Sequence, residues 1–342
     1  MMNGSNTYLI AAVACLGLAG DAGAANWDTK TADDWEEAAA DEDWQMTPGL
    51  PYFPYYKVEK ISEHVYTFRE GFYRSPFFIT GEGVIATDPL TVAGGKRMLR
   101  EIKLLTDEPI KYVIYSHSHW DHVAGGQPFK DEGAQFISQE RCLTNFKLRA
   151  NPDVVMPDVT FDENYTLELG EVSIEMQYFG PSHDICLTVG VIKPENILWA
   201  VDVAPPAGGN NWPFNPTMAD VYMYNMVPFL RSIEALVKEE GIKMLMGGHA
   251  HFNRIDPPMK GMMPGIVMDG TMGPPDSVTR RRIFWERANE VVANEIEAGL
   301  PLDEIPAKLS EQGALSELVT DYDEALAKIL FTRIVELFRT GQ

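Results

Sequence analysis

Residues 116–122 read SHSHWDH, so three histidines and one aspartate fall within six positions, directly after a short apolar β-rich run. In an extended segment, side chains two residues apart point to the same side, so His117 and His119 can face one ion. The turn that follows can bring Asp121 and His122 towards a second ion. Single histidines often cap helices or lie satisfied in a core, but this density is typical of neither role. Because imidazole and carboxylate groups bind zinc, iron and manganese, the stretch predicts a metal site.

The segments on both sides of this stretch alternate between strand and helix patterns. Turn residues separate β-rich runs at Val65–Phe68, Phe77–Thr80, Val84–Thr87, Tyr112–Tyr115, Ala134–Ile137, Val172–Tyr178, Cys186–Ile192, Ile197–Val201 and Lys243–Met246. Helical spacing occurs at Lys96–Leu105 and Met226–Glu239. Helices and strands in alternation indicate the α/β class, with the His-rich stretch in a loop that follows a strand.

The C-terminal part of the chain has a different pattern. Amphipathic helices are expected at Arg280–Ala298, Leu302–Leu309 and Asp321–Phe338. Residues 259–342 are therefore predicted to form a helical region. Its apolar side chains suffice either to pack on the preceding domain or to pair with another chain, so a homo-oligomer through these helices stays open.

The first 25 residues carry the pattern of an export signal. An apolar run, Tyr8–Gly20, is followed by Ala22-Gly23-Ala24, which fits a signal-peptide core and an A-x-A cleavage site. Residues 1–25 are therefore expected to be removed and the mature protein to be periplasmic or secreted, although Met1–Thr7 contains no Lys or Arg. A lipoprotein attached through Cys15 is the less favoured alternative. The run is too short for a stable membrane span, and no later stretch reaches about 18 apolar residues.

The charge of the chain argues against one class of partner. The sequence has 50 Asp and Glu against 28 Lys and Arg, a formal net charge of -22. Such a protein repels polyanions, so nucleic acid is not expected as a substrate. Residues 26–57 add to the excess and are expected to form an acidic N-terminal arm. Beyond the signal, Cys142 and Cys186 allow at most one disulfide, and whether they pair stays open.

The order His-x-His-x-Asp-His after a strand resembles the signature of the metallo-β-lactamase superfamily. Similar counterparts of its other motifs follow in order at Asp88, Gly180-Pro181-Ser182-His183-Asp184, Leu198-Trp199-Ala200-Val201-Asp202 and Gly247-Gly248-His249-Ala250. The resemblance defines residues 58–258 as a catalytic domain. It implies an α/β fold, an αββα sandwich, to which the helical C-terminal region is appended.

The resemblance also implies two zinc ions per chain, with iron or manganese as alternatives. Their ligands would be His117, His119 and His183 at one ion, Asp121, His122 and His249 at the other, and Asp202 between the two. Asp88 would buttress the site. His251 is the alternative to His249, which is favoured because it follows a glycine pair at a strand end. Asp184 is expected to be a ligand neighbour that caps or pairs locally, and His64 to be structural.

The chemistry implied is hydrolysis by a metal-bound hydroxide, because each ion lowers the pKa of a bound water and polarises a carbonyl or phosphoryl oxygen. Asp121 is the predicted catalytic residue, which orients the nucleophile or carries its proton. Phe72 and Tyr73, in a hairpin expected to overhang the site, and Trp212, in the aromatic loop 204–224, are the candidate substrate contacts. An equal alternative is that the loop aromatics seal the junction with the C-terminal helices. No Lys or Arg cluster adjoins the motifs, so a neutral or weakly anionic small molecule is expected as substrate.

Several activities are consistent with these residues. Asp202 stands where one group of β-lactamases in the family has a cysteine, so the chain looks more like lactonases, thioesterases and phosphodiesterases. The first hypothesis is an exported dinuclear zinc hydrolase of a small ester, lactone or related carbonyl compound. β-Lactam hydrolysis is the alternative within the class, and a di-iron oxidoreductase is the alternative outside it, because these ligands do not select zinc over iron. A non-catalytic metal-binding module ranks last, since the ligand set is complete.

Overall fold

The computed structural model describes residues 56–70, 73–203, 222–249, 251–255, 265–269, 272–319 and 322–341. The predicted signal peptide and nearly all of the predicted acidic arm, residues 1–55, lie outside this set. Among the described residues, no helix is long and apolar enough to cross a membrane.

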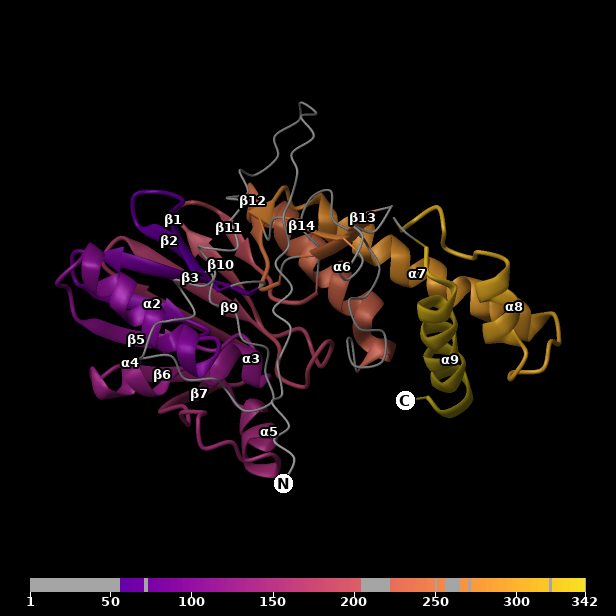
Figure 1. Cartoon of the computed structure of the whole chain (residues 1–342), viewed down its shortest axis with the longest axis horizontal. Coiled ribbons are helices and arrows are strands. Elements are labelled where there is room, and N and C mark those ends of the chain that lie inside the picture. Colours follow the sequence, from indigo (N-terminus) through magenta and orange to yellow (C-terminus); the bar gives the residue numbers. More distant parts are fainter. Residues whose placement is uncertain are drawn as a thin grey trace, which may run out of the picture.

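The first of two large sheets has seven strands in sequence order (Figure 1). The strands are β1 (Tyr56–Lys60), β2 (Val65–Glu70), β3 (Tyr73–Thr80), β4 (Gly83–Thr87), β5 (Ile110–Ile114), β6 (Gln135–Gln139) and β7 (Val159–Phe161). Neighbours from β1 to β4 pair antiparallel, and neighbours from β4 to β7 pair parallel. The carboxyl end of β5 therefore opens directly into the His-rich stretch.

The second sheet has six strands in the order β15-β12-β11-β10-β9-β8. Their bounds are β8 (Asn164–Leu169), β9 (Val172–Gln177), β10 (Val189–Lys193), β11 (Ile197–Trp199), β12 (Met244–Met246) and β15 (Met272–Gly273). Only the β11–β12 pair is parallel among these neighbours. A separate hairpin, β13 (His251–Ile255) with β14 (Gly265–Asp269), connects β12 to β15.

Side chains along both sheets alternate between two apolar layers. The layer between the sheets is a buried cluster that includes Phe78, Ile85, Ile114, Trp199 and Met246. Sequence neighbours of these residues point outward and pack under helices. In the first sheet, Phe77, Val84 and Val113 lie under α2 (Val92–Leu105), α4 (Gln127–Asp131) and α5 (Cys142–Leu148). In the second sheet, Leu198 and Leu245 lie under α6 (Met223–Glu239). This alternation makes both faces of each sheet apolar, so helices cover the outer faces. The predicted αββα sandwich is confirmed.

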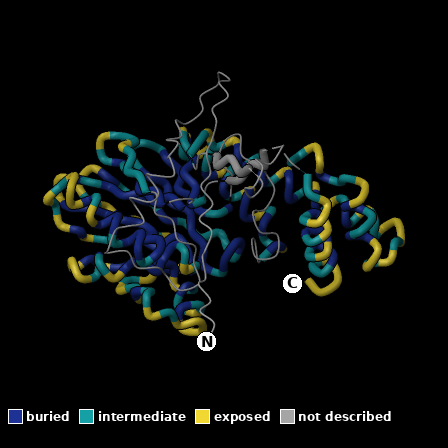
Figure 2. Tube along the Cα trace, in the orientation of Figure 1, coloured by how far each residue is buried: buried dark blue, intermediate teal, exposed yellow. Residues whose placement is uncertain are grey.

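Three helices follow the sandwich: α7 (Asp276–Glu297), α8 (Ile305–Glu311) and α9 (Glu324–Thr340). They share one apolar core with α6 and the second sheet, through buried residues such as Trp285 on α7 and Phe331 on α9. Figure 1 shows α8 and α9 at the far end of α7, and Figure 2 shows buried residues concentrated in the sandwich. The predicted helical region, residues 259–342, starts before the first of these helices, and β14 and β15 precede α7 within it. These two strands were not predicted, because strands this short carry no readable periodicity.

Candidate metal centre

The predicted ligands lie in loops that follow strands of both sheets. β5 of the first sheet leads into residues 116–122, and the short helix α3 (Trp120–Val123) begins within them. In the second sheet, β11 leads to Asp202 and β12 to His249, while His183 lies in the connection from β9 to β10. The site is therefore built where one end of the first sheet meets one end of the second.

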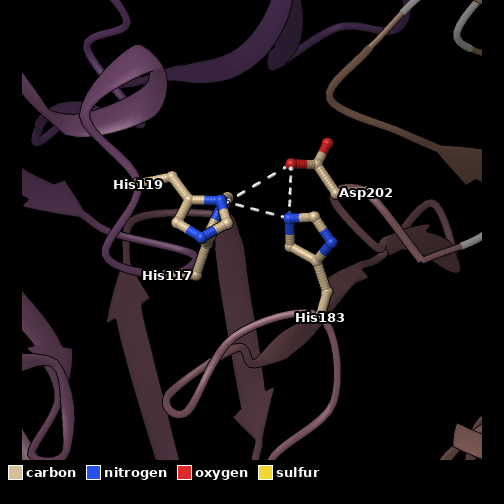
Figure 3. Close-up of side chains that lie close together, drawn as sticks. All are labelled: His117, His119, His183 and Asp202. Carbon is tan, nitrogen blue, oxygen red and sulfur yellow. Dashed lines mark hydrogen bonds and ion pairs between the residues drawn. The ribbon is translucent and has the colours of Figure 1, made fainter. Parts of the chain in front are cut away.

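Seven predicted ligands gather in two adjoining groups. The first group is His117, His119, His183 and Asp202, and the second is Asp121, His122 and His249; within each, the potential ligand atoms lie within 4.8 Å of one another. Figure 3 shows the first group, with imidazole nitrogens directed at the Asp202 carboxylate. Asp202 also reaches the second group, because its Oδ2 lies 3.2 Å from His122 Nε2 and its Oδ1 lies 3.3 Å from His249 Nε2. This is the position that the resemblance gives to a bridging ligand.

The donor atoms converge in a way that suits a cation. His183 Nε2 lies 3.1 Å from His119 Nδ1, and a similar nitrogen pair in the second group is 2.9 Å apart. A neutral imidazole carries one N–H and one lone pair, so two nitrogens at this distance either share one proton or both direct a lone pair at a common ion. Among the described residues, His117 Nε2 and Asp202 Oδ1 are buried with no hydrogen-bond partner. Buried polar atoms are normally satisfied, so the residues present fit a metal ion held by histidine and carboxylate ligands.

Local backbone geometry explains two residue types in the motifs. Asp202 follows β11 with a φ of 63°, a left-handed conformation that aspartate tolerates better than most residues. Gly248 lies against it: a Cβ there would stand 2.4 Å from Val201 Cγ1 and 3.1 Å from Asp202 Oδ1. The glycine before His249 is therefore required for lack of space beside the ligands.

Asp88, at the end of β4, holds the first ligand through Ser116. Its Oδ1 accepts the Ser116 N–H at 2.8 Å, and its Oδ2 accepts the Ser116 hydroxyl at 2.6 Å. The Ser116 Oγ lies 2.8 Å from His117 Nδ1, which turns Nε2 of this imidazole towards the site. Outer partners of this kind orient metal ligands and fix the ring nitrogen that binds. The buttressing role implied for Asp88 thus passes through a serine that the sequence pattern treats as a spacer.

Two histidines of the first group, His117 and His119, are uncharged at neutral pH in the protein alone. Burial lowers the pKa of His117 well below its ordinary value, and the neighbouring imidazoles add to this effect. Burial and His183 lower the pKa of His119 to about 4. Metal binding needs unprotonated imidazole, so these histidines are ready to coordinate without losing a proton.

The second group holds protons instead. Burial alone lowers the pKa of His249, but the Asp202 and Asp121 carboxylates outweigh it and raise the pKa to about 9. Burial is outweighed by the same carboxylates at His122, whose pKa lies well above its ordinary value. In turn, burial raises the pKa of Asp202, but His249 and His122 more than offset this and hold it well below its ordinary value.

The three candidate substrate contacts have different outcomes. Tyr73 is buried, with its ring edge-on to His249 at a centroid distance of 4.8 Å and to His122 at 6.0 Å. It packs behind the ligands of the second group, and its contact with substrate stays a prediction. Phe72 and Trp212 lie outside the described residues.

Other residues singled out from the sequence also have definite places. His251 is the first residue of β13, whereas the ligand group contains His249. His64 Nδ1 lies 3.0 Å from the Ile79 carbonyl oxygen, in the first sheet. Asp184 belongs to neither ligand group among the described residues and accepts hydrogen bonds from Ser118 instead.

The two cysteines whose pairing the sequence left open are joined. Cys142 and Cys186 form a disulfide with an S–S distance of 2.11 Å, and both are fully buried. The bond links the first residue of α5 to the loop that carries His183.

Comparison with known proteins places these motifs in a broader context. Residues 70–245 match the family described as the metallo-beta-lactamase superfamily, which is half of the chain. A curated relative, the 2,4-dinitroanisole O-demethylase subunit alpha of Nocardioides sp. (strain JS1661), is 25% identical over 158 residues. The match covers 45% of this chain and 48% of the relative, so the chain spans about half the length of that protein.

Solved structures show the same fold at low sequence identity. A metallo-beta-lactamase from Pontibacter korlensis is 17% identical with a TM-score of 0.55, covering 68% of this chain and 99% of that one. A double mutant of the sec-alkyl sulfatase PisA1 is 17% identical with a TM-score of 0.61, covering 84% of this chain and 51% of that one. The DIM-1 metallo-beta-lactamase is 16% identical with a TM-score of 0.54, covering 69% and 100%. At these identities the likeness concerns the fold alone.

Proposed function

This chain belongs to the metallo-beta-lactamase superfamily, and from that premise we propose that it is a dinuclear zinc hydrolase of a small ester, lactone or related carbonyl compound. The observation that supports this most directly is the position of Asp202, whose two carboxylate oxygens contact histidines of both groups. A carboxylate shared between two histidine groups suits a pair of adjacent cations. The same donor set accepts iron or manganese, so the choice of zinc belongs to the proposal.

The residues of the second group supply the acid–base chemistry. A zinc pair would acidify a bound water and polarise the oxygen of the substrate. Asp121 is the most exposed carboxylate of the site, with 23% of its side chain exposed against 6% for Asp202. Burial raises the pKa of Asp121, but His122 and His249 outweigh it and keep the group ionised. Asp121 can therefore orient an attacking water by accepting a hydrogen bond from it, the first of the two roles predicted for this residue.

The substrate class has a second candidate. The curated relative is named for removing the O-methyl group of 2,4-dinitroanisole, and one structural neighbour is an alkyl sulfatase. The name of the curated relative describes a reaction at a bond to oxygen, which agrees with an ester or lactone. It adds an activated aryl methyl ether as the second candidate substrate of this chain.

Metal analysis combined with a substrate panel tests this proposal. The chain from Asn26 onward would be purified and its metal content measured, with turnover of an aryl ester, a lactone, a β-lactam and 2,4-dinitroanisole in the same preparation. We expect close to two zinc ions per chain and turnover of the ester or lactone. His119→Ala should abolish turnover, while His64→Ala, the matched histidine control, should not. Absence of bound metal, or two irons with redox activity only, would contradict the proposal.

We also propose that the protein is exported. The pattern of residues 1–25 supports export, and so does the Cys142–Cys186 disulfide, because disulfides persist in oxidising compartments. Cell fractionation with N-terminal sequencing tests this, with a mature chain beginning near Asn26 outside the cytoplasm as the expected result. Exposed Ile283 on α7 and Phe338 on α9 support the further proposal of a homo-oligomer, which sedimentation would detect.

A further inference from the structure

The two serines of residues 116–122 are held in the same way by two different aspartates. Asp88 holds Ser116, as described above, and Asp184 holds Ser118 from the connection between β9 and β10. The Ser118 N–H donates to Asp184 Oδ2 at 2.9 Å, and the Ser118 hydroxyl donates to the same oxygen at 2.6 Å. Asp88 acts within the first sheet, whereas Asp184 joins the loop after β5 to the loop that carries His183.

The second oxygen of Asp184 is engaged as well. Its Oδ1 accepts the N–H of Ile185 at 2.7 Å and the side-chain amide of Asn145 at 2.9 Å. The Asn145 Nδ2 also donates to Ser118 Oγ at 2.7 Å, which closes a ring of three side chains. A buried carboxylate is costly unless its oxygens receive donors, and Asp184, which is 4% exposed, receives four. The arrangement is therefore a fully satisfied polar network.

The disulfide joins two of the three segments that this network connects, α5 and the loop that carries His183. Cys142 and Asn145 are three residues apart on α5 and so share one face of the helix. Cys186 lies two residues after Asp184, and both cysteines are fully buried. We call Ser118, Asn145, Asp184 and the Cys142–Cys186 disulfide the α5 clamp.

We propose that the α5 clamp fixes the distance between the loop of His117 and His119 and the loop of His183, and so sets the affinity of the first group for its metal ion. Ser118 lies between two ligands in the sequence, and Asp184 directly follows the third. The loops come from different sheets, and His119 Nδ1 already lies 3.1 Å from His183 Nε2. With the clamp, the ligands need not be ordered when the ion binds, which preserves affinity. Asn145 and Asp184 are thus positioning residues, and the inference rests on the proposed metal-dependent function.

Metal titration of clamp variants tests the inference without using activity. Asn145→Ala and Ser118→Ala remove one network member each, and Thr144→Ala, at an exposed neighbour on α5, is the matched control. Binding of Co²⁺ and Zn²⁺ would be measured by competition with a chelator, and the Co²⁺ spectrum would report ligand geometry. We expect the first-group affinity to fall about 10- to 100-fold, the range for outer partners of metal ligands. The second-group affinity and the Thr144→Ala protein should stay as in wild type.

Further measurements separate positioning from a general loss of folding. An unfolded variant would lose both ions, whereas a clamp variant should lose affinity at one group and keep its circular dichroism spectrum. Ser118→Thr restores a hydroxyl and should recover the Co²⁺ spectrum that Ser118→Ala changes. Wild-type affinity and spectrum in both Asn145→Ala and Ser118→Ala would overturn the inference. A wild-type protein that binds no metal would instead overturn the proposed function.

A separate variant tests whether the disulfide contributes to metal affinity. The double variant Cys142→Ala with Cys186→Ala leaves all three hydrogen-bonding members of the clamp in place. We expect weaker first-group binding in this variant than in wild type, because α5 and the His183 loop are then joined by hydrogen bonds alone. Unchanged affinity would remove the disulfide from the clamp.

Discussion

Asp202 and His122 belong to different ligand groups, yet their side chains are in contact, with Oδ2 3.2 Å from Nε2. Asp202 comes from the second sheet and His122 from the first, so this contact crosses the sandwich as well as the site. It makes the two groups a single unit, and a change at Asp202 acts on both.

Replacement of Asp202 should therefore be more damaging than replacement of a ligand in one group. We expect Asp202→Ala to weaken binding of both ions and to lower turnover by more than about 100-fold. This loss exceeds the one expected when a residue that only hydrogen-bonds a metal ligand is replaced. His119→Ala should weaken one ion only. Elemental analysis and calorimetric titration of the two proteins would show the difference, and equal metal loss in both would argue against a shared carboxylate.

Gly248 offers a test of the space around the ligands. A Cβ at this position would lie 2.4 Å from Val201 Cγ1 and 3.0 Å from His122 Cε1. We expect Gly248→Ala to destabilise the fold by about 1–3 kcal/mol, as overpacking does, and to reduce metal content. At Gly81 a Cβ would meet no described atom within 4 Å, so Gly81→Ala serves as the control in urea unfolding.

Metal binding should depend on pH differently at the two groups. The pKa of His249 is about 9, so below that pH an incoming ion must displace a proton, and affinity falls as pH falls. The pKa of His119 is about 4, so first-group binding should vary little between pH 6 and pH 9. Calorimetry in buffers of different ionisation enthalpy measures the released protons. Proton release when an ion binds to the first group, without proton release at the second group, would contradict this assignment.

Glu70 predicts a pH dependence of stability. Its side chain is 1% exposed, its Oε2 accepts the Thr91 hydroxyl at 2.8 Å, and Oε1 has no hydrogen-bond partner among the described residues. Burial raises the pKa of Glu70 to about 7 from 4.5. The pKa of Glu70 is higher in the folded than in the unfolded protein, so protonation of Glu70 favours the folded state. This contribution to the free energy of unfolding is fully present below pH 4.5 and is lost as the pH rises through 7.

The corresponding variant should remove this dependence. Glu70→Gln cannot ionise, so above pH 7 it should be more stable than wild type by up to about 3 kcal/mol, and close to wild type near pH 4.5. Urea unfolding at several pH values measures the difference, with Glu63→Gln as the control at an exposed carboxylate. A constant difference at all pH values would show that Glu70 does not titrate between the two states.

The ligands of residues 116–122 were predictable from their density after a strand-like run, whereas His183, Asp202 and His249 were predicted from the resemblance to the family's motifs. His117, His119, Asp121 and His122 share one short segment, and Asp202 and His249 each follow apolar residues that read as strands. The strand and helix patterns indicated the α/β class, and the layers of the sandwich were predicted from the resemblance. Adjacent Phe77 and Phe78 do not show in the sequence which of them points outward, because both are apolar.

The supporting residues were not predictable for a physical reason. Ser116 and Ser118 look like spacers, because the aspartates that hold them are distant in the sequence and meet them only in the fold. Asn145 lies on a helix of seven residues, too short for a periodic signal. The short helices α3 and α4, and the strands β7 and β15, escaped notice in the same way, since tertiary pairing rather than local pattern defines them.

The division of the ligands between two sheets has a consequence for how the protein acquires its ions. The chain up to β7 holds four of the seven candidate ligands, and the three that follow arrive with the second sheet. A nascent or translocating chain therefore has no complete coordination sphere until both halves have been made and have docked. On the proposed metal-dependent function, both ions are therefore expected to bind after the two sheets have docked, from the metal supply of the compartment where folding ends.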